Sequence, residues 1–192
     1  MSEQDRMRWD ATYAGRCEAV AEPAPPAVFA ARESVFPVTG TALDIACGAG
    51  FGSVWLARRG LQVWGVDLSA VAIDHAEALA ARYGVADRCR FDVVDLDGGL
   101  PAGPAVDVIL CHRFRDPGLY PAMIERLTPA GILAISVLSE VGREPGRFRA
   151  VPGELLAAFG GLEVIDAGEG GGEAWLLARS PGDGRRPPGL RQ

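Results

Sequence analysis

The stretch LDIACGAGFG, residues 43–52, lies between a predicted strand, Thr41–Ala46, and a predicted helix, Ser53–Arg59. Its glycines allow a tight turn and let the backbone approach a ligand without Cβ atoms in the way. The helix that follows begins with free backbone N–H groups. In open α/β sheets, ligands bind outside the carboxyl ends of the strands. We therefore expect Gly48 and Gly50 to face a ligand at this turn.

Outward from this turn, apolar strands alternate with helical patterns. Further strands are expected at residues 61–66, 89–94, 106–111, 132–138, 162–167 and 174–179, and helices at 70–83, 120–127 and 152–159. Strands separated by helices imply parallel, right-handed crossovers. The last two strands have no helix between them and should form an antiparallel hairpin. The predicted fold is α/β: a doubly wound, mostly parallel seven-stranded sheet with a C-terminal antiparallel hairpin.

Three regions are predicted along the chain. Residues 1–36 are expected to form an N-terminal helical cap, in which a helix over residues 27–36 ends before Pro37. Trp9 and Tyr13, four residues apart, share one helix face. They either cover the ligand as a lid or pack on the core. Residues 37–179 form the ligand-binding domain, and residues 180–192, rich in proline and glycine, are expected to be a disordered tail.

Composition excludes several classes of partner. The 192 residues suffice for one hydrophobic core, and the net charge of −6 gives no overall attraction to nucleic acid or to an anionic membrane. The polar N-terminus lacks a signal-peptide core, and no apolar run reaches the ~20 residues that span a bilayer, so a cytoplasmic location is expected. The cysteines do not have the spacing of a zinc site or a dense disulfide framework, so no metal is expected and all should be reduced thiols: Cys17, Cys47, Cys89 and Cys111.

Spacing in the glycine-rich turn favours S-adenosylmethionine (SAM) over NAD. A dinucleotide fingerprint would require glycine where Ser53 stands. Asp44 beside the turn suits the ammonium and sulfonium of SAM and would repel a pyrophosphate. Asp67, after the second strand, can accept both ribose hydroxyls. Asp95, after the third, could accept from the adenine amino group. A single aspartate at a strand end is most often a turn or cap residue, so the prediction rests on the set.

The runs LDIACGAGFG, VDLS at residues 66–69 and VVDL at residues 93–96 resemble the motifs of class I SAM-dependent methyltransferases over about residues 40–180. The chain departs from the first motif at Ala46, which is usually glycine. The stretches 9–13, 111–114 and 152–155 are similar to the small bacterial tellurite-resistance and thiopurine-type group. The resemblance and the strand ends together imply these cofactor-binding residues: Trp9, Tyr13, Asp44, Ala46, Gly48, Gly50, Asp67, Leu68, Asp95, Leu96 and Cys111.

Candidates for the methyl acceptor side follow the fourth and fifth strands. His112 could act as a general base, whereas His75, in the middle of a helix, is expected to face solvent. Arginine side chains suit oxyanions and carboxylates, and the chain offers Arg113 and Arg115 after the fourth strand and Arg143, Arg147 and Arg149 in the next loop. The alternative is that most of these are solvated loop charges. The predicted catalytic residues are His112, Arg113 and Arg147.

The favoured hypothesis is a methyltransferase acting on a small-molecule acceptor, possibly anionic or a thiol or oxyanion. No sizeable insertion is present to hold a macromolecule. Two alternatives stay open: an NAD-dependent oxidoreductase, and a SAM-binding regulatory or degenerate domain without catalysis. The first lacks its third glycine. The second keeps the glycines and carboxylates, which predict binding whether or not catalysis follows.

Overall fold

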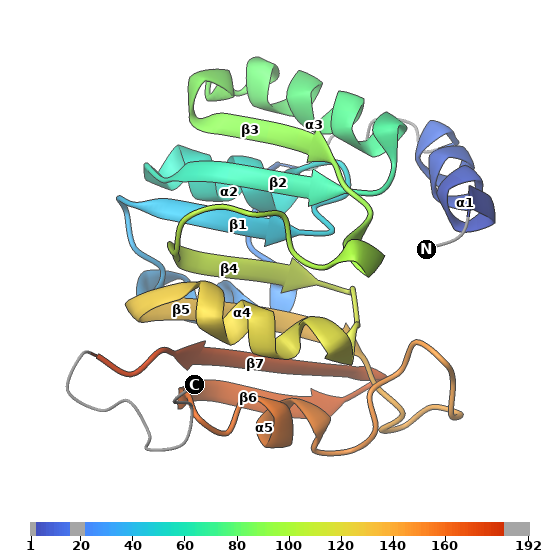
Figure 1. The fold of residues 1–192 in the computed structure, drawn as a ribbon, viewed down its shortest axis with the longest axis vertical. Helices are drawn as coiled ribbons and strands as arrows, with labels where there is room; N and C mark the ends of the chain where they lie inside the picture. Colours follow the sequence, from blue (N-terminus) through green and yellow to red (C-terminus); the bar gives the residue numbers. More distant parts are fainter. Residues whose placement is uncertain (1–2, 16–21, 183–192) are drawn as a thin grey trace.

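The computed structural model describes residues 3–15 and 22–182, which contain one seven-stranded sheet in the order β3-β2-β1-β4-β5-β7-β6 (Figure 1). Only β7 runs antiparallel to its neighbours. The strands are β1 Thr41–Ile45, β2 Gln62–Asp67, β3 Cys89–Val93, β4 Val106–His112, β5 Leu127–Leu138, β6 Glu163–Gly170 and β7 Glu173–Arg179. This arrangement confirms the predicted doubly wound sheet with a C-terminal hairpin.

Helices cover both faces of the sheet. They are α1 Glu3–Ala14, α2 Phe51–Arg59, α3 Ala70–Arg82, α4 Tyr120–Arg126 and α5 Glu154–Ala158, with short 3-10 segments η1 Ala27–Val35, η2 Ala86–Arg88, η3 Leu96–Gly98 and η4 Pro117–Leu119. One apolar cluster joins η1, α2 and α3 to the sheet, and a second joins α4 and α5 to its other face. Figure 1 accordingly shows α4 in front of the sheet and α2 behind it.

The N-terminal helix α1 lies beyond the carboxyl ends of the strands (Figure 1) and buries none of its own residues. A polar contact joins it to the start of α3, where the Ser69 hydroxyl donates to Asp10 Oδ1 over 2.5 Å. Ser69 also caps α3 by accepting from the Ala72 N–H. Because α1 contributes no buried side chain, its stability depends on what its inner face contacts.

Four local expectations differ from the structure. Residues 27–35 form a 3-10 segment with a kink at Arg32, not an α-helix, and this segment buries Phe29 between two proline-rich ends. α5 begins at Glu154, because Gly153 at φ +78° precedes it. β5 starts at Leu127, five residues before the predicted strand at 132–138, and residues 128–131 form a bulge within it. β6 and β7 are longer than predicted and meet at two glycines with positive φ, 171 and 172.

Of the four cysteines, Cys47, Cys89 and Cys111 are free thiols, whereas Cys17 lies outside the described residues. The predicted tail at residues 180–192 also falls almost entirely outside them. Over residues 3–15 and 22–182, no group of histidine, cysteine or acidic side chains is arranged to hold a metal ion. In the same two ranges no helix has the length and apolarity needed to cross a bilayer.

Candidate functional site

The turn between β1 and α2 places three alternate residues in the left-handed region of backbone conformation: Ala46 at φ +55°, Gly48 at φ +54° and Gly50 at φ +78°. Glycine adopts this region freely, whereas an L-residue with a side chain does so at a cost of about 1–2 kcal/mol. Ala46 therefore carries backbone strain at the motif position that is usually glycine. Such strain persists where the surrounding structure fixes the backbone.

The two predicted glycines face opposite sides. A Cβ on Gly48 would lie 2.6 Å from the Tyr13 hydroxyl oxygen, so this glycine faces the cavity under α1. A Cβ on Gly50 would instead lie 2.6 Å from the Cβ of Ala76, on α3. Gly50 does not line the cavity. Its role in the structure is to let α2 and α3 pack closely.

Asp67 at the end of β2 organises the turn. Its Oδ2 accepts the Gly48 N–H over 2.9 Å, and its Oδ1 accepts the Ser69 N–H over 2.9 Å. Burial raises the pKa of this carboxyl, while these backbone N–H groups oppose the rise. Each carboxylate oxygen can accept a second hydrogen bond. The side chain is thus fixed by the backbone, and its oxygens have the capacity to accept further hydrogen bonds from hydroxyl groups.

Asp44 on β1 is fully buried beside the same turn, and its Oδ2 accepts from the Ser53 hydroxyl over 2.6 Å. Burial, and then the nearby charge of Asp67, raise the pKa of Asp44 to about 7, against the lowering effect of Ser53. A buried carboxylate of this kind is stabilised by a cation placed against it. The ammonium group of an amino acid moiety would provide one.

A cavity of about 640 Å³ opens at the carboxyl ends of the strands. Ten of the predicted residues line it: Trp9, Tyr13, Asp44, Ala46, Gly48, Asp67, Leu68, Leu96, His112 and Arg113. The Trp9 and Tyr13 rings, with centroids 6.2 Å apart, line the cavity from α1. The structure therefore brings the N-terminal helix, the glycine-rich turn and the end of β4 around one space.

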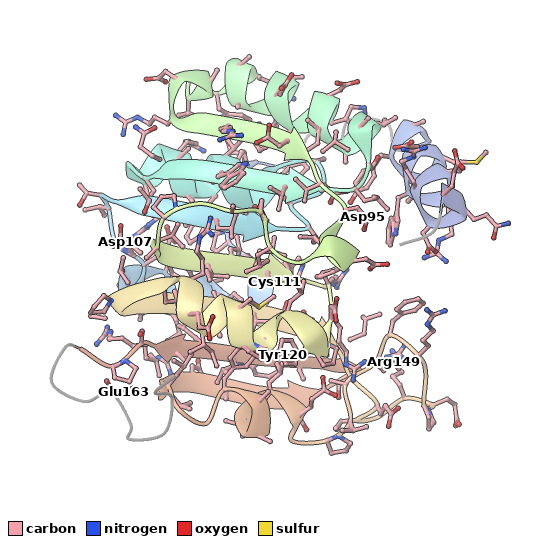
Figure 2. All side chains as sticks on the ribbon, viewed as in Figure 1. Asp95, Asp107, Cys111, Tyr120, Arg149 and Glu163 are labelled. Atoms are coloured by element: carbon pink, nitrogen blue, oxygen red, sulfur yellow. The ribbon has the colours of Figure 1, made fainter. Side chains whose placement is uncertain are left out.

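Besides Gly50, three predicted residues lie outside the cavity lining. Asp95, exposed at the edge of the sheet (Figure 2), accepts the Asp97 N–H over 3.0 Å and begins η3. Cys111 is completely buried, which raises the pKa of its thiol. Arg147 is exposed, with its guanidinium 5.3 Å from the centre of the Phe148 ring.

Several cavity residues were not predicted. His75, expected to face solvent, lines the cavity, as do Leu79 and Arg82 from the same helix. Their spacing of four and then three residues places them on one face of α3, and this periodicity could have identified them. The side chains of Phe51, Leu110 and Phe114 complete the apolar wall. Phe51 lies inside the glycine-rich stretch, so the sequence pattern could have predicted its place in the cavity wall.

His112, the last residue of β4, is partly buried, and its Nδ1 lies 2.6 Å from the Ser136 hydroxyl on β5. Burial, followed by the charge of Arg113, lowers the pKa of His112, so the ring is predominantly neutral at pH 7. Arg113 adopts φ +59°, and its N–H donates to the Ser136 carbonyl over 2.8 Å. The strained backbone turns this arginine towards the mouth of the cavity, which it lines.

The other arginines have structural partners or point away. Arg115 makes two hydrogen bonds of 2.7 Å to the carboxylate of Glu154, which also accepts from the Tyr120 hydroxyl. Arg149, which is labelled in Figure 2, donates to the Ser139 carbonyl over 2.8 Å. Of the five arginines considered, only Arg113 lines the cavity.

Comparisons with known proteins, by sequence and by structure, show what this chain resembles. A family model described as a methyltransferase domain matches residues 42–131. A ubiquinone biosynthesis O-methyltransferase from Psychrobacter cryohalolentis is 32% identical over 136 residues, which is 66% of this chain and 49% of the relative. The chain spans half or less of the length of the curated relatives that it matches.

Solved structures show the same fold at low sequence identity. TehB from Haemophilus influenzae superposes with a TM-score of 0.71 at 18% identity, over 90% of this chain and 67% of that one. The [4+2]-cyclase SpnF superposes with a TM-score of 0.68 at 18% identity, over 95% and 97% of the two chains. These similarities show the fold alone. The family match adds that residues 42–131 are similar to a methyltransferase domain.

Proposed function

We propose that this chain, which matches a methyltransferase-domain family model over residues 42–131, transfers a methyl group from SAM to a small-molecule acceptor. The observation that carries the proposal is that side chains of opposite charge line one cavity. By charge alone, we call Asp44 and Asp67 its acidic end, and His112 and Arg113 its basic end. The acidic end suits a cationic cofactor, and the basic end suits an acceptor with anionic character.

The residues of the acidic end fit SAM in three respects. The oxygens of Asp67 have the capacity to accept further hydrogen bonds from the two ribose hydroxyls. Asp44 offers a buried carboxylate for the ammonium group. Leu68 and Leu96 offer apolar surface for the adenine ring. When bound, SAM supplies a methyl group already activated by a sulfonium centre, so the protein has to position the acceptor and exclude water.

The residues of the basic end act on the acceptor. Arg113 holds an anionic group at the mouth, and the neutral ring of His112 accepts a proton where the acceptor arrives protonated. Trp9 and Tyr13 cover the cavity from α1 and exclude water, which is one of the two roles predicted for them. The acceptor class that suits this wall is a small molecule with an apolar body and a thiol or oxyanion group.

Calorimetry with SAM, S-adenosylhomocysteine and NAD tests the cofactor. We expect the first two to bind with one site per chain and NAD to give no heat of binding. Tight NAD binding with no response to SAM would overturn the proposal. An acceptor screen with thiols, phenols and carboxylates then separates a methyltransferase from a binding module, because a module without catalysis binds SAM but forms no S-adenosylhomocysteine with any acceptor.

A further inference from the structure

The carboxyl edge of the sheet carries a polar row that crosses three neighbouring strands. His112 on β4 pairs in register with Ser136 on β5, and Ser136 pairs with Trp175 on β7. Glu173 stands two residues before Trp175, so its side chain projects from the same face of the sheet. It is therefore the diagonal neighbour of Ser136, at a separation that a long side chain can span.

The glutamate at the end of this row has an unusual environment. Its Oε1 is buried and accepts no hydrogen bond from the described residues. A buried acceptor without a donor costs about 1–3 kcal/mol, and such groups in folded proteins normally have a partner. The charge of Glu173 also reaches His112, since it favours the protonated form of that ring. The row thus ends in an acceptor-only group whose Oε1 lacks a donor among the described residues.

The carboxylate of Glu173 determines the direction of the hydrogen bonds along this row. A carboxylate can only accept, whereas a hydroxyl both donates and accepts. If Ser136 gives its proton towards Glu173, directly or through a water, its oxygen is left to accept from the His112 ring 2.6 Å away. Nδ1 then carries the ring proton, and Nε2, the other ring nitrogen, is left as a base on a side chain that lines the cavity.

We infer that Ser136 and Glu173 are positioning residues, which hold His112 with Nδ1 protonated and Nε2 free to take a proton from the methyl acceptor. The role in catalysis rests on the proposed function, whereas the arrangement of the row does not. In the step, the acceptor's proton moves to Nε2 while its heteroatom forms a bond to the methyl carbon. The carbon–sulfur bond breaks and its electron pair stays on sulfur. The products are a methylated acceptor, a thioether and an imidazolium, whose charge Glu173 stabilises.

The first test needs neither cofactor nor acceptor. The chain has only two histidines, so a ¹⁵N-histidine sample gives two ring systems, and His75→Gln assigns them. Long-range ¹H–¹⁵N spectra of the full chain at pH 8 report which ring nitrogen carries the proton. We expect the Nδ1–H form for His112, and a mixture or a switch to Nε2–H in Ser136→Ala. A predominant Nε2–H form in the unmodified protein would overturn the inference.

A matched control is available on the same strand end. Ser139 is also fully buried, and its hydroxyl accepts the Val141 N–H, away from the row. Ser139→Ala should leave the tautomer of His112 unchanged. An equal change in Ser139→Ala and Ser136→Ala would show that the signal reports general loosening of β5, and would count against a specific role for Ser136.

The role of Glu173 is tested by titration of the same ring. Arg113 acts on His112 from its own strand and Glu173 from β7, while Asp44, Asp67, His75 and Arg82 line the same cavity. In Glu173→Gln, the pKa of His112 should fall, because the charge of Glu173, which raises it, is gone. Glu169→Gln is the control, since Glu169 on β6 instead accepts the Gly153 N–H. An unchanged pKa in Glu173→Gln would remove Glu173 from the row.

Calorimetry with S-adenosylhomocysteine separates the two proposals. Binding in the unmodified protein and in Ser136→Ala, combined with the Nδ1–H tautomer, supports both. Absence of binding with the Nδ1–H tautomer overturns the proposed function and leaves the row intact. Binding with the Nε2–H tautomer overturns the row and leaves the cofactor assignment intact.

Discussion

The two ends of the cavity are built in different ways. At the acidic end, both oxygens of Asp67 accept backbone N–H groups, and Asp44 is buried against Ser53, so each side chain has one position. At the basic end, His112 is held by Ser136, whereas Arg113 is exposed on a strained turn. The acidic end is fixed before any ligand arrives, which suits a constant cofactor. The exposed arginine of the basic end can be replaced without disturbing the sheet.

The largest effect is a loss of stability expected from a substitution at Gly50, in the glycine-rich turn beside the acidic end. In Gly50→Val the new side chain would overlap Ala76, where even a Cβ lies 2.6 Å from that residue's Cβ, at a φ of +78°. Overpacking and left-handed backbone each cost about 1–3 kcal/mol, so the melting temperature should fall on the order of 10 °C. Thermal unfolding followed by circular dichroism measures this.

Gly84→Val is the control for Gly50→Val. Gly84 has a similar φ of +68°, and nothing lies within 4 Å of the position that its Cβ would take. It isolates the backbone cost from the overlap with α3. Equal losses of stability in the two variants would show that the packing of α2 against α3 through Gly50 contributes nothing.

The next largest effect concerns Asp67. Asp67→Ala removes the acceptor of two backbone N–H groups and of the ribose hydroxyls. Hydrogen bonds to charged groups contribute on the order of 1.5–3 kcal/mol, so the affinity for S-adenosylhomocysteine should fall about 10- to 150-fold. Calorimetry measures the affinity, and Asp95→Ala, at an exposed residue outside the cavity lining, should change it far less. Unchanged affinity in a folded Asp67→Ala protein would exclude Asp67 as the ribose ligand.

These two predictions also show how far the sequence leads. The strand and helix alternation predicted the sheet, and Asp44 on β1 and Asp67 on β2 were predicted to face a ligand and line the cavity. The sequence did not predict that Gly48 faces the cavity whereas Gly50 faces α3. This difference depends on Ala76, 26 residues further along the chain. The local sequence pattern indicates which backbone conformation the turn needs, but it does not indicate which distant residues pack against the turn.

The basic end was harder to predict for the same reason. Arg115 and Arg113 look alike in the sequence, yet one is bound to Glu154, 39 residues away, and the other lines the cavity. The pairing of His112 with Ser136 likewise depends on strand register. His75 was misplaced because a single polar residue on an amphipathic helix was read without its neighbours at positions 79 and 82. Long-range pairing decides which charges remain available for a ligand.

A smaller effect is expected from the pH dependence of the affinity for S-adenosylhomocysteine, which tests the acidic end. Because burial raises the pKa of Asp44 to about 7, this group is protonated below pH 7 in the free protein and must ionise to hold an ammonium group. The affinity for S-adenosylhomocysteine should therefore fall as the pH falls below 7, by up to about tenfold per unit. Calorimetry between pH 5.5 and 8.5 measures it. In Asp44→Asn this dependence should disappear, and whatever dependence is left reports Asp67 and the histidines. A flat profile in the unmodified protein would place the ammonium group elsewhere.

The smallest effect is expected from Arg147→Ala, in the loop that follows β5. The side chain is exposed, lies over Phe148 and does not line the cavity, so the affinity for S-adenosylhomocysteine should change less than about twofold and the stability by less than about 0.5 kcal/mol. Arg113→Ala, at a residue that lines the mouth, is the comparison, and it should reduce turnover of an anionic acceptor with little effect on cofactor affinity. A tenfold loss of cofactor affinity in Arg147→Ala would mean that the loop after β5 closes over the cofactor itself. The basic end would then be as fixed in the bound protein as the acidic end is without a ligand, and the contrast between the two would hold only for the free protein.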